Sequence, residues 1–278
     1  MFSVLLSTYH GDRQIWLGEA LESMLKQTIL PQQFVVVADG PLPESHHQLI
    51  AKYKKLFEKK FVSFDLLYLS ENKGLGFALK AGANICKMPY VVRMDSDDIS
   101  TPTRLEELKA LINENPMISV FGAMIEEFNK EPGDIKRLRR VPVSHDSIVK
   151  HSYFYNPINH VTACIKRSSL FAVGSYETVL WHEDYFLWIK MIFNGYRFYN
   201  LNQVHVHVRV DGFNNRRSGL KYLLSEQQFA HRCVENRYWS KLNAAVYMMP
   251  RVLIRLLPNR VVGVVYQLLR TAKGKARE

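Results

Sequence analysis

The sequence is poor in cysteine and in long apolar runs. Its 278 residues include three cysteines, Cys86, Cys164 and Cys233, which lie far apart and form no CxxC pair. An odd number of scattered cysteines argues against a disulfide framework and a structural zinc site, and favours a reducing compartment. No window approaches the ~18 uncharged apolar residues of a membrane-spanning helix. The first residues form a strand-like run without a basic region or cleavage site, so we expect no signal peptide and predict a cytoplasmic protein.

Two glycine-rich phosphate-binding motifs are also missing. Gly74 and Gly76 lack a third glycine at the Rossmann spacing and follow the third predicted strand rather than the first. A dinucleotide-binding fingerprint is therefore not expected, and these glycines are interpreted as a turn and a helix start. The sequence contains no GxxxxGK[ST] pattern, which excludes a P-loop NTPase.

Acidic residues are scarce at the C-terminal end. Residues 216–278 hold 13 Lys and Arg against 3 Asp and Glu, net +10, whereas residues 1–215 hold 24 against 23, net +1. This asymmetry predicts that residues 216–278 meet an anionic partner, with membrane lipid, nucleic acid and a lipid diphosphate as candidates. A solubilising surface is the alternative, and charge alone does not choose between them.

Strands and helices alternate through the first hundred residues. Short apolar runs predict strands, and apolar residues at helical spacing between them predict helices. The predicted strands are 2–7, 34–38, 64–69 and 90–94, and the helices are 17–25, 49–57 and 77–85. This alternation implies right-handed βαβ units, and so an α/β fold with a mostly parallel sheet covered by helices on both faces.

Polar residues follow each of these strands. They are Thr8-Tyr9, Asp39, Asn72-Lys73-Gly74 and Asp95-Ser96-Asp97. Ligands of open parallel sheets bind outside the carboxyl ends of the strands, so we expect these four loops to share one edge.

Three carboxylates are packed into four residues after the fourth strand. Asp95, Asp97 and Asp98 repel one another unless a cation or a set of donors neutralises them. Oxygen ligands of this kind suit Mg²⁺ or Mn²⁺, which keep positions open for phosphate oxygens. The sequence therefore predicts a metal–diphosphate site, with a solvated acidic turn before the helix that begins near Thr101-Pro102 as the alternative.

The second half of the chain is less regular. Residues 129–150 are polar and predict an irregular excursion, and 161–165 predict a strand. A helix opens near Trp181 with Glu183 and Asp184 in its first turn, where acids also simply complement the helix dipole. Two histidines, His205 and His207, share one side of a predicted strand, and a half-exposed polar face is favoured there over a metal site.

In their order and spacing, these residues resemble an inverting family 2 glycosyltransferase with the GT-A fold. The resemblance spans about residues 2–217 and is similar in detail to bacterial enzymes that assemble O-antigen or exopolysaccharide repeat units. The segments that carry it are Ser7-Thr8-Tyr9, Gln27-Thr28, Val36-Val37-Ala38-Asp39-Gly40, Asn72-Lys73-Gly74-Leu75-Gly76, Arg93-Met94-Asp95-Ser96-Asp97-Asp98, Pro102, Arg104, Asn156-Pro157-Ile158-Asn159-His160, Glu183-Asp184 and Arg216-Arg217-Ser218-Gly219.

The resemblance implies a UDP-sugar donor and a manganese or magnesium ion. Tyr9 would stack on the uracil and Asp39 would accept its ring N–H, while Asp95 would contact the ribose or a metal-bound water. Asp97 would coordinate the metal across the two phosphates. The expected nucleotide-binding residues are Thr8, Tyr9, Asp39, Asn72, Lys73, Arg93, Asp95 and Ser96, and the expected metal ligands are Asp97 and Asp95.

The resemblance also implies how the acceptor is used. Asp184 would be the general base that takes the proton of the acceptor hydroxyl, and Glu183 would hydrogen-bond the acceptor sugar. An α-linked UDP-sugar would then give a β-linkage. Further residues expected at the acceptor are His160, Trp181, His182, Arg216 and Arg217.

The expected domains are a GT-A catalytic domain, 1–215, and a basic amphipathic helical extension, 216–278. The first divides into a nucleotide-sugar half, about 1–100, and an acceptor half, about 101–215. Within the extension, Val261 to Leu269 predict a helix with one apolar face. Such a helix suits an anionic leaflet, so we expect peripheral attachment at the inner face of a bacterial cytoplasmic membrane, with a lipid-diphosphate-linked sugar as acceptor. A helix packed on the catalytic core is the alternative.

Some positions depart from the family pattern. Ala38 replaces an acid often found before Asp39, and Lys190 stands where many relatives carry arginine. No Gln-x-x-Arg-Trp motif follows, which argues against a processive synthase. A sugar-nucleotidyltransferase is a second hypothesis, but Ser7 to Gly11 lack the glycine-rich basic loop it needs. A nucleic-acid-binding protein is a third, but it leaves the carboxylates unexplained, so no nucleic acid is expected as a partner.

Overall fold

The computed structural model describes residues 1–210 and 219–256. The chain divides into two compact units, which are described separately. One comprises residues 1–152 and 156–213, and the other comprises residues 153–155 and 214–278.

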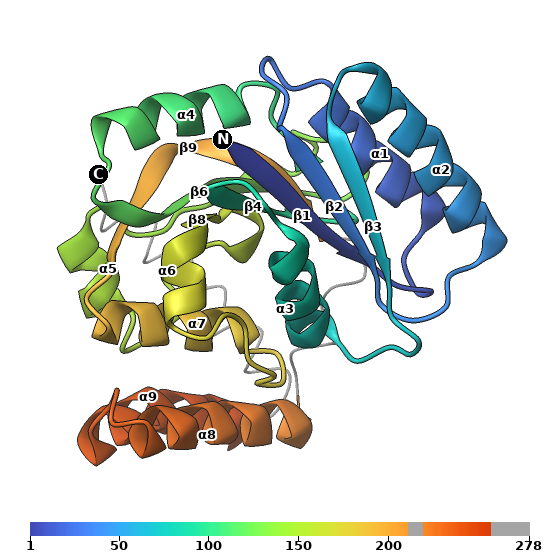
Figure 1. Ribbon diagram of the computed structural model, residues 1–278. Coiled ribbons are helices and arrows are strands. Elements are labelled where there is room, and N and C mark those ends of the chain that lie inside the picture. The colour runs from blue at the N-terminus through green and yellow to red at the C-terminus, as the bar shows by residue number, and fades with distance from the viewer. Residues whose placement is uncertain (211–218, 257–278) are drawn as a thin grey trace. The chain divides into compact units, whose positions relative to one another are not determined.

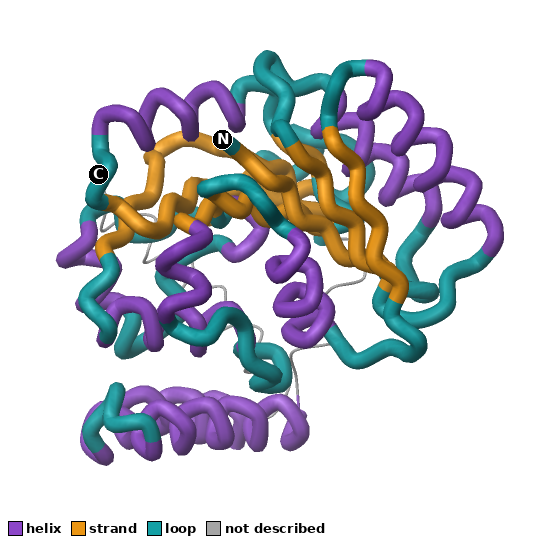
Figure 2. The backbone as a smooth tube through the Cα atoms, viewed as in Figure 1, coloured by secondary structure: helices purple, strands orange, loops and turns teal. Residues whose placement is uncertain are grey.

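The first unit is built on one mixed sheet, orange in Figure 2. The strands β1 to β4 pair in parallel, while β8 runs antiparallel to its neighbours β4 and β6. In the order of the sheet, the described strands are β3 (Ser63–Tyr68), β2 (Gln33–Ala38), β1 (Phe2–Thr8), β4 (Tyr90–Asp95), β8 (Cys164–Lys166), β6 (Ile118–Phe128), β9 (Arg197–Arg209) and β5 (Ile99–Ser100), with β7 (Arg137–Arg139) paired to β6.

Helices cover both faces of this sheet (Figure 1). Successive side chains of a strand point to opposite faces, so Val4 and Leu6 join one core and Leu5 joins the other. The first core includes side chains of α1 (Gln14–Leu25), α2 (Glu44–Lys59) and α4 (Arg104–Glu114). The second includes side chains of α3 (Leu75–Ile85), α5 (His145–His151), α6 (Arg167–Ala172) and α7 (Glu183–Phe193). The predicted α/β fold with a mostly parallel sheet is confirmed.

The register of the parallel strands brings their carboxyl ends to one edge. Ser7 lies opposite Asp95, and Thr8 lies opposite Ala38, which in turn lies opposite Tyr68. The polar residues that follow these strands therefore leave the sheet at the same level.

Two local expectations need correction. Residues 129–150 are not wholly irregular, because β7 pairs with the end of β6 and α5 begins at His145 with Ser144 as its N-cap. The predicted strand at 161–165 is a 3₁₀ turn, His160–Thr162, followed by β8. The short β8 begins late because the Thr162 hydroxyl is bonded to the Asn159 carbonyl, which closes the turn.

The second unit contains α8 (Gly219–Glu235) and α9 (Lys241–Leu256). Their contact is aromatic, with the Trp239 ring 5.4 Å from Phe229 and 5.1 Å from Tyr247 between ring centroids. Within the described residues, no helix is long and apolar enough to span a membrane. The predicted domain boundary at 215/216 and the predicted helix at 261–269 lie outside the described residues.

Candidate functional site

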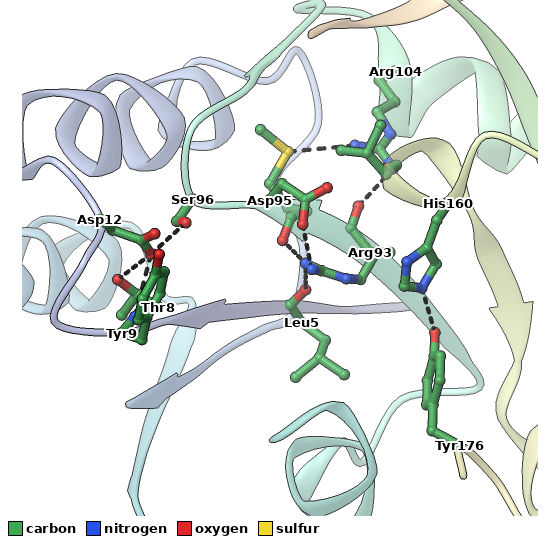
Figure 3. A network of polar contacts seen from close by, with 12 residues as sticks. Leu5, Thr8, Tyr9, Asp12, Arg93, Asp95, Ser96, Arg104, His160 and Tyr176 are labelled. Atoms are coloured by element: carbon green, nitrogen blue, oxygen red, sulfur yellow. Dashed lines mark hydrogen bonds and ion pairs between the residues drawn. The ribbon is translucent and has the colours of Figure 1, made fainter. Parts of the chain in front are cut away.

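Asp12 ties the loop after β1 to the loop after β4. Its Oδ2 accepts hydrogen bonds from the Thr8 hydroxyl at 2.9 Å, the Tyr9 backbone N–H at 3.2 Å and the Ser96 hydroxyl at 2.6 Å (Figure 3). The turn itself closes because the Asp12 N–H donates to the Tyr9 carbonyl. One carboxylate thus joins three of the residues expected to bind the nucleotide.

The Tyr9 ring is folded down over Gly11. A Cβ at Gly11 would lie 2.5 Å from the ring, closer than real Cβ contacts come, so a larger residue would displace the ring. Gly11 therefore sets where the aromatic face expected to stack on a base is presented.

Asp39 holds the loop after β3 against the loop after β2. Its two carboxylate oxygens accept the backbone N–H groups of Lys73 at 2.8 Å and Gly74 at 3.0 Å, and its side chain is buried. Gly40, with φ +88°, permits this approach, because a Cβ there would lie 2.7 Å from the Asn72 nitrogen. Each Asp39 carboxylate oxygen keeps a second lone pair for a ligand N–H.

The Lys73 side chain lies on the same loop. Its ammonium is 3.4 Å from Glu71 and 4.9 Å from the centre of the Phe77 ring.

Two buried arginines lie beneath the acidic loop. Arg93 pairs with Asp95 and donates to the Met94 carbonyl, so it faces the carboxylates from inside the protein. Arg104, 0 % exposed, donates from Nη2 to the carbonyls of Arg93 at 2.8 Å and Val161 at 2.9 Å. Burial lowers the pKa of Arg104 to about 10, so it stays charged at neutral pH. Arg104 thereby links β4 to the 3₁₀ turn that carries His160.

Asp97 and Asp98 differ in what surrounds them. The Asp98 carboxylate accepts the Arg209 backbone N–H at 2.9 Å, which fixes the loop to β9, and burial followed by the charges of Asp97 and Asp95 raises its pKa well above the usual value. Burial and the charges of Asp95 and Asp12 raise the pKa of Asp97 to about 7. Both carboxylates are therefore harder to ionise here than in water.

This donor set fits a divalent cation. The carboxylates of Asp97 and Asp95 supply hard oxygen ligands, and burial together with the charges of Asp95 and Asp12 makes Asp97 harder to ionise unless a cation is near. Among the described residues, no group of three His, Cys, Asp or Glu side chains is placed to hold a metal by itself. A cation here would therefore need oxygens of a bound diphosphate as well, as magnesium sites commonly do.

The acceptor residues predicted on α7 stand at its first turn. The Asn156 side-chain amide donates to Asp184 Oδ2 at 2.6 Å and so orients the expected base. Burial raises the pKa of the neighbouring Glu183 to about 7, and its Oε2 has no hydrogen-bond partner among the described residues. Trp181 is exposed and adopts φ +63°, a conformation rare for a bulky residue and associated with functional sites. His182, by contrast, is buried.

The starts of α3 and α7 meet at Gly76. A Cβ there would lie 3.2 Å from Glu183 Cβ and 3.2 Å from the Glu177 carbonyl oxygen. Lys190 fixes the same segment, because its ammonium contacts the Ser175 carbonyl at 2.9 Å and Glu177 at 2.7 Å. These contacts give Lys190 a structural partner that the sequence left open.

His160 lies between the two acidic regions. Burial lowers the pKa of His160, on which the charges of Asp184, Arg93 and Asp95 also act. The segment that carries His160 contacts both regions, because Asn156 donates to Asp184 and Arg104 donates to the carbonyls of Val161 and Arg93. Figure 3 shows Arg93 and Asp95 on one side of His160, with Tyr176 bonded to it from below. The loop after β4 and the start of α7 therefore act on one space.

The two histidines of β9 are engaged elsewhere. His205 Nε2 lies 3.0 Å from Glu107, and His207 Nδ1 lies 2.7 Å from Glu126. Burial lowers the pKa of His205 to about 4, so it is neutral in this contact. His207 is half-buried, but His205 is fully buried, so the expectation of a half-exposed face is wrong for His205.

Sequence reasoning missed three residues of this region and could not be tested on two others. Asp12, Tyr176 and the buried position of Arg104 were not predicted, although Asp12 lies four residues after Thr8 in a glycine-containing turn that offered a signal. Arg216 and Arg217 lie outside the described residues.

The chain is similar to a known family and to named relatives. The model of "Glycosyl transferase family 2" matches residues 3–174. A UDP-Gal:alpha-D-GlcNAc-diphosphoundecaprenol beta-1,3-galactosyltransferase of Escherichia coli is 33 % identical over 267 residues, covering 96 % of this chain and 95 % of the relative. The amylovoran biosynthesis glycosyltransferase AmsE of Erwinia amylovora is 32 % identical over 268 residues, covering 96 % and 98 %.

Solved structures share the fold at lower identity. S. aureus TarS 1–349 in complex with UDP superposes with a TM-score of 0.66 at 19 % identity, covering 94 % of this chain and 73 % of that one. The mannosyltransferase PcManGT from Pyrobaculum calidifontis, in complex with GDP-Man and Mn²⁺, gives 0.64 at 15 % identity, covering 98 % and 75 %. The predicted GT-A fold is confirmed by these similarities.

Proposed function

The chain belongs to glycosyl transferase family 2, and from that premise we propose that it moves a hexose or N-acetylhexosamine from a UDP-sugar to a hydroxyl of a lipid-diphosphate-linked sugar. The family resemblance read from the sequence is thereby confirmed, and the chain is an enzyme of this family. The E. coli relative is named for UDP-Gal and a GlcNAc-diphosphoundecaprenol, which supports a UDP-sugar donor and this class of acceptor. The product would belong to a bacterial surface polysaccharide such as O-antigen or exopolysaccharide.

One observation carries the proposal most. The segment that carries His160 contacts both acidic regions. Asn156 donates to Asp184 at the start of α7. Arg104 donates to the carbonyls of Val161 and of Arg93, the partner of Asp95 where the loop after β4 begins. A donor held at the loop after β4 and an acceptor held at the start of α7 would thus face each other across one space. Transfer between two bound substrates needs this arrangement.

Each residue of the site has a separate proposed role. Asp184, oriented by the Asn156 amide, would accept the proton of the acceptor hydroxyl. The hydroxyl oxygen would attack the anomeric carbon from the side opposite UDP. Tyr9 and Asp39 would hold the uracil, and Lys73 would face the diphosphate. A Mn²⁺ or Mg²⁺ ion held by Asp97 and Asp95 would offset the charge of the leaving diphosphate. Attack from the opposite side inverts the configuration and gives a β-linkage.

Donor turnover tests this proposal. UDP release should appear with one UDP-sugar of a panel of UDP-Gal, UDP-Glc, UDP-GalNAc and UDP-GlcNAc, in the presence of Mn²⁺ and synthetic GlcNAc- or GalNAc-diphosphate-lipid. It should fall to background without the acceptor. Formation of a nucleotide sugar from a nucleoside triphosphate and a sugar phosphate instead would support a nucleotidyltransferase and contradict the proposal.

We also propose that the second unit contacts the anionic inner face of a bacterial membrane. Leu242, Val246, Met249 and Val252 recur at helical spacing on α9 and are exposed. An exposed apolar stripe within a segment of net +10 suits peripheral binding to anionic lipid. The protein would then work in the cytoplasm, next to its lipid-linked acceptor.

Vesicle co-sedimentation with the full chain tests this contact. The double variant Leu242→Glu/Met249→Glu should lose binding to phosphatidylglycerol vesicles. The matched variant Asn236→Glu/Asn243→Glu adds the same charge off the stripe and should keep most of it. Equal loss in both would show that net charge alone is responsible and would overturn a role for the stripe.

A further inference from the structure

Tyr176 is a buried residue whose hydroxyl contacts the site. It follows α6, is 1 % exposed, and places its hydroxyl 3.1 Å from His160 Nε2. The His160 ring also packs edge-on against Trp188, at 6.0 Å between centroids. The ring of His160 is therefore held in position by two neighbours from the segment that leads into and through α7.

The direction of this hydrogen bond follows from counting donors and acceptors. The Tyr176 hydroxyl has one hydrogen to donate, and among the described residues the His160 ring is its only hydrogen-bond partner. If Nε2 carried the proton, the phenol hydrogen would be left without an acceptor in a buried place, which costs about 1–3 kcal/mol. The tyrosine therefore donates, and Nε2 is the acceptor.

A neutral imidazole carries one proton, so it must then sit on Nδ1. Burial lowers the pKa of His160, which keeps the ring neutral at neutral pH. Burial also raises the pKa of Tyr176, so its hydroxyl keeps the hydrogen it donates. Histidine in water prefers the proton on Nε2, so this tautomer is imposed by the protein.

The Nδ1–H group is available to a ligand. His160 is only partly buried, and among the described residues no hydrogen bond occupies its Nδ1. After burial, the charges that act on the ring are those of Asp184, the proposed base, then Arg93 and then Asp95. Asn156, four residues before His160, donates to Asp184 and so places the base beside the segment that carries the ring. An N–H donor next to a base that takes a hydroxyl proton is suited to hold the oxygen of a sugar hydroxyl.

We propose that Tyr176 is a positioning residue that fixes the Nδ1–H tautomer of His160, and that this N–H donates a hydrogen bond to a hydroxyl oxygen of the acceptor sugar. This inference rests on the proposed function for the identity of the ligand, but not for the tautomer. His160 transfers no proton in this role, because Asp184 remains the group that accepts it. The hydrogen bond would hold the acceptor in the orientation from which its oxygen attacks.

The tautomer can be measured without any substrate. Long-range ¹H–¹⁵N correlation spectra of ¹⁵N-histidine-labelled protein should show His160 with the proton on Nδ1, and Tyr176→Phe should shift it toward the Nε2–H form. Tyr53→Phe is the matched control, because it removes another buried hydroxyl, bonded to Glu22 at 3.0 Å on the first core, and should leave His160 unchanged. An Nε2–H tautomer in the unaltered protein would overturn the inference.

A pair of substitutions tests the ligand. The amide nitrogen of His160→Asn can replace Nδ1–H, whereas that of His160→Gln reaches toward the Nε2 position. The acceptor KM should therefore rise about 3- to 10-fold more in His160→Gln than in His160→Asn, the size of one net hydrogen bond, with the donor KM alike in both. Equal acceptor KM values, or a change confined to the donor KM, would contradict the assignment.

Binding of the acceptor gives a readout that does not need turnover. Titrating a soluble GlcNAc-diphosphate-alkyl acceptor should move the His160 Nδ1–H resonance in the unaltered protein. An unmoved resonance while other signals report binding would overturn the ligand role. If no UDP-sugar is turned over, the proposed function fails, and the spectra still decide the tautomer.

Discussion

The edge of the sheet that is proposed to bind the donor is built differently from the segment proposed to bind the acceptor. At the donor edge, Asp12 and Asp39 bond to neighbouring loops and Asp98 bonds to the end of β9, so the loops that follow separate strands are held in place. In the acceptor segment, Ser175 and Trp181 adopt positive φ, and Glu183 Oε2 has no described partner. The donor edge is thus ordered before any ligand arrives, whereas the acceptor segment keeps strain and unused hydrogen-bonding capacity for its ligand.

The largest expected effect separates chemistry from donor binding. Asp184→Asn removes the proposed base but keeps the hydrogen-bond geometry with Asn156, so transfer should fall by about 10²–10⁴-fold. The affinity for UDP, measured by calorimetry, should stay unchanged. Asp146→Asn, an exposed acid on α5, is the control and should transfer normally. Near-normal transfer by Asp184→Asn would move the base elsewhere, with Glu183 the next candidate.

The converse change should act on the donor alone. Asp97→Ala removes the proposed cation ligand, so UDP affinity in Mn²⁺ should fall by about 10²-fold, equivalent to about 3 kcal/mol. Affinity without Mn²⁺ should hardly differ from that of the unaltered protein. Calorimetry with and without Mn²⁺ measures both, and an unchanged manganese dependence would rule out Asp97 as a ligand.

The two regions also differ in how far the sequence predicts them, and the donor edge is the more predictable one. The donor edge depends on strand periodicity and on the parallel sheet, which bring Thr8, Ala38 and Asp95 to one level without any tertiary detail. The cross-link through Asp12 was missed because its acceptor role depends on the approach of Ser96, 84 residues away. Arg104 was expected from the family pattern, but its complete burial depends on the carbonyls of Arg93 and Val161.

The acceptor segment was harder to predict for a physical reason. Residues 174–182 are held by contacts with other elements, such as Lys190 with Glu177 and the close approach of Gly76 to the Glu177 carbonyl, rather than by periodic structure. Glu183 and Asp184 could be named from their place at a helix start, but their surroundings could not. Nothing in the sequence indicates that Tyr176 is buried, because a tyrosine between regular elements is expected at the surface until its partner is known.

A smaller effect should follow from crowding the contact between α3 and α7. Gly76→Ala adds a Cβ 3.2 Å from Glu183 Cβ, so the start of α7 must shift by a few tenths of an ångström. The acceptor KM should rise several-fold while the UDP affinity is kept. Gly18→Ala, whose Cβ would meet Leu49 at an ordinary 3.7 Å, is the matched control and should have no effect on either. A change in UDP affinity instead would mean that Gly76 serves the donor edge.

The smallest effect concerns stability and its pH dependence. The pKa of Asp97 is raised to about 7, so between its ordinary value and pH 7 the folded state binds more protons than the unfolded state. Stability without metal should therefore fall as pH rises through this range. Asp97→Asn should raise Tm by a few degrees at pH 7.5 and flatten the pH profile. Thermal melts with EDTA check this, and an unchanged or lower Tm in the variant would contradict a repelled carboxylate.

The central claim is that an acceptor oxygen activated by Asp184 attacks the sugar from the side opposite the UDP held at the donor edge. The anomeric configuration of the new linkage tests this most directly, because attack from the opposite side inverts the α-configuration of a UDP-sugar. The H1–H2 coupling constant of the anomeric proton in the isolated product should show a β-linkage. An α-linkage would contradict a single displacement across these two regions.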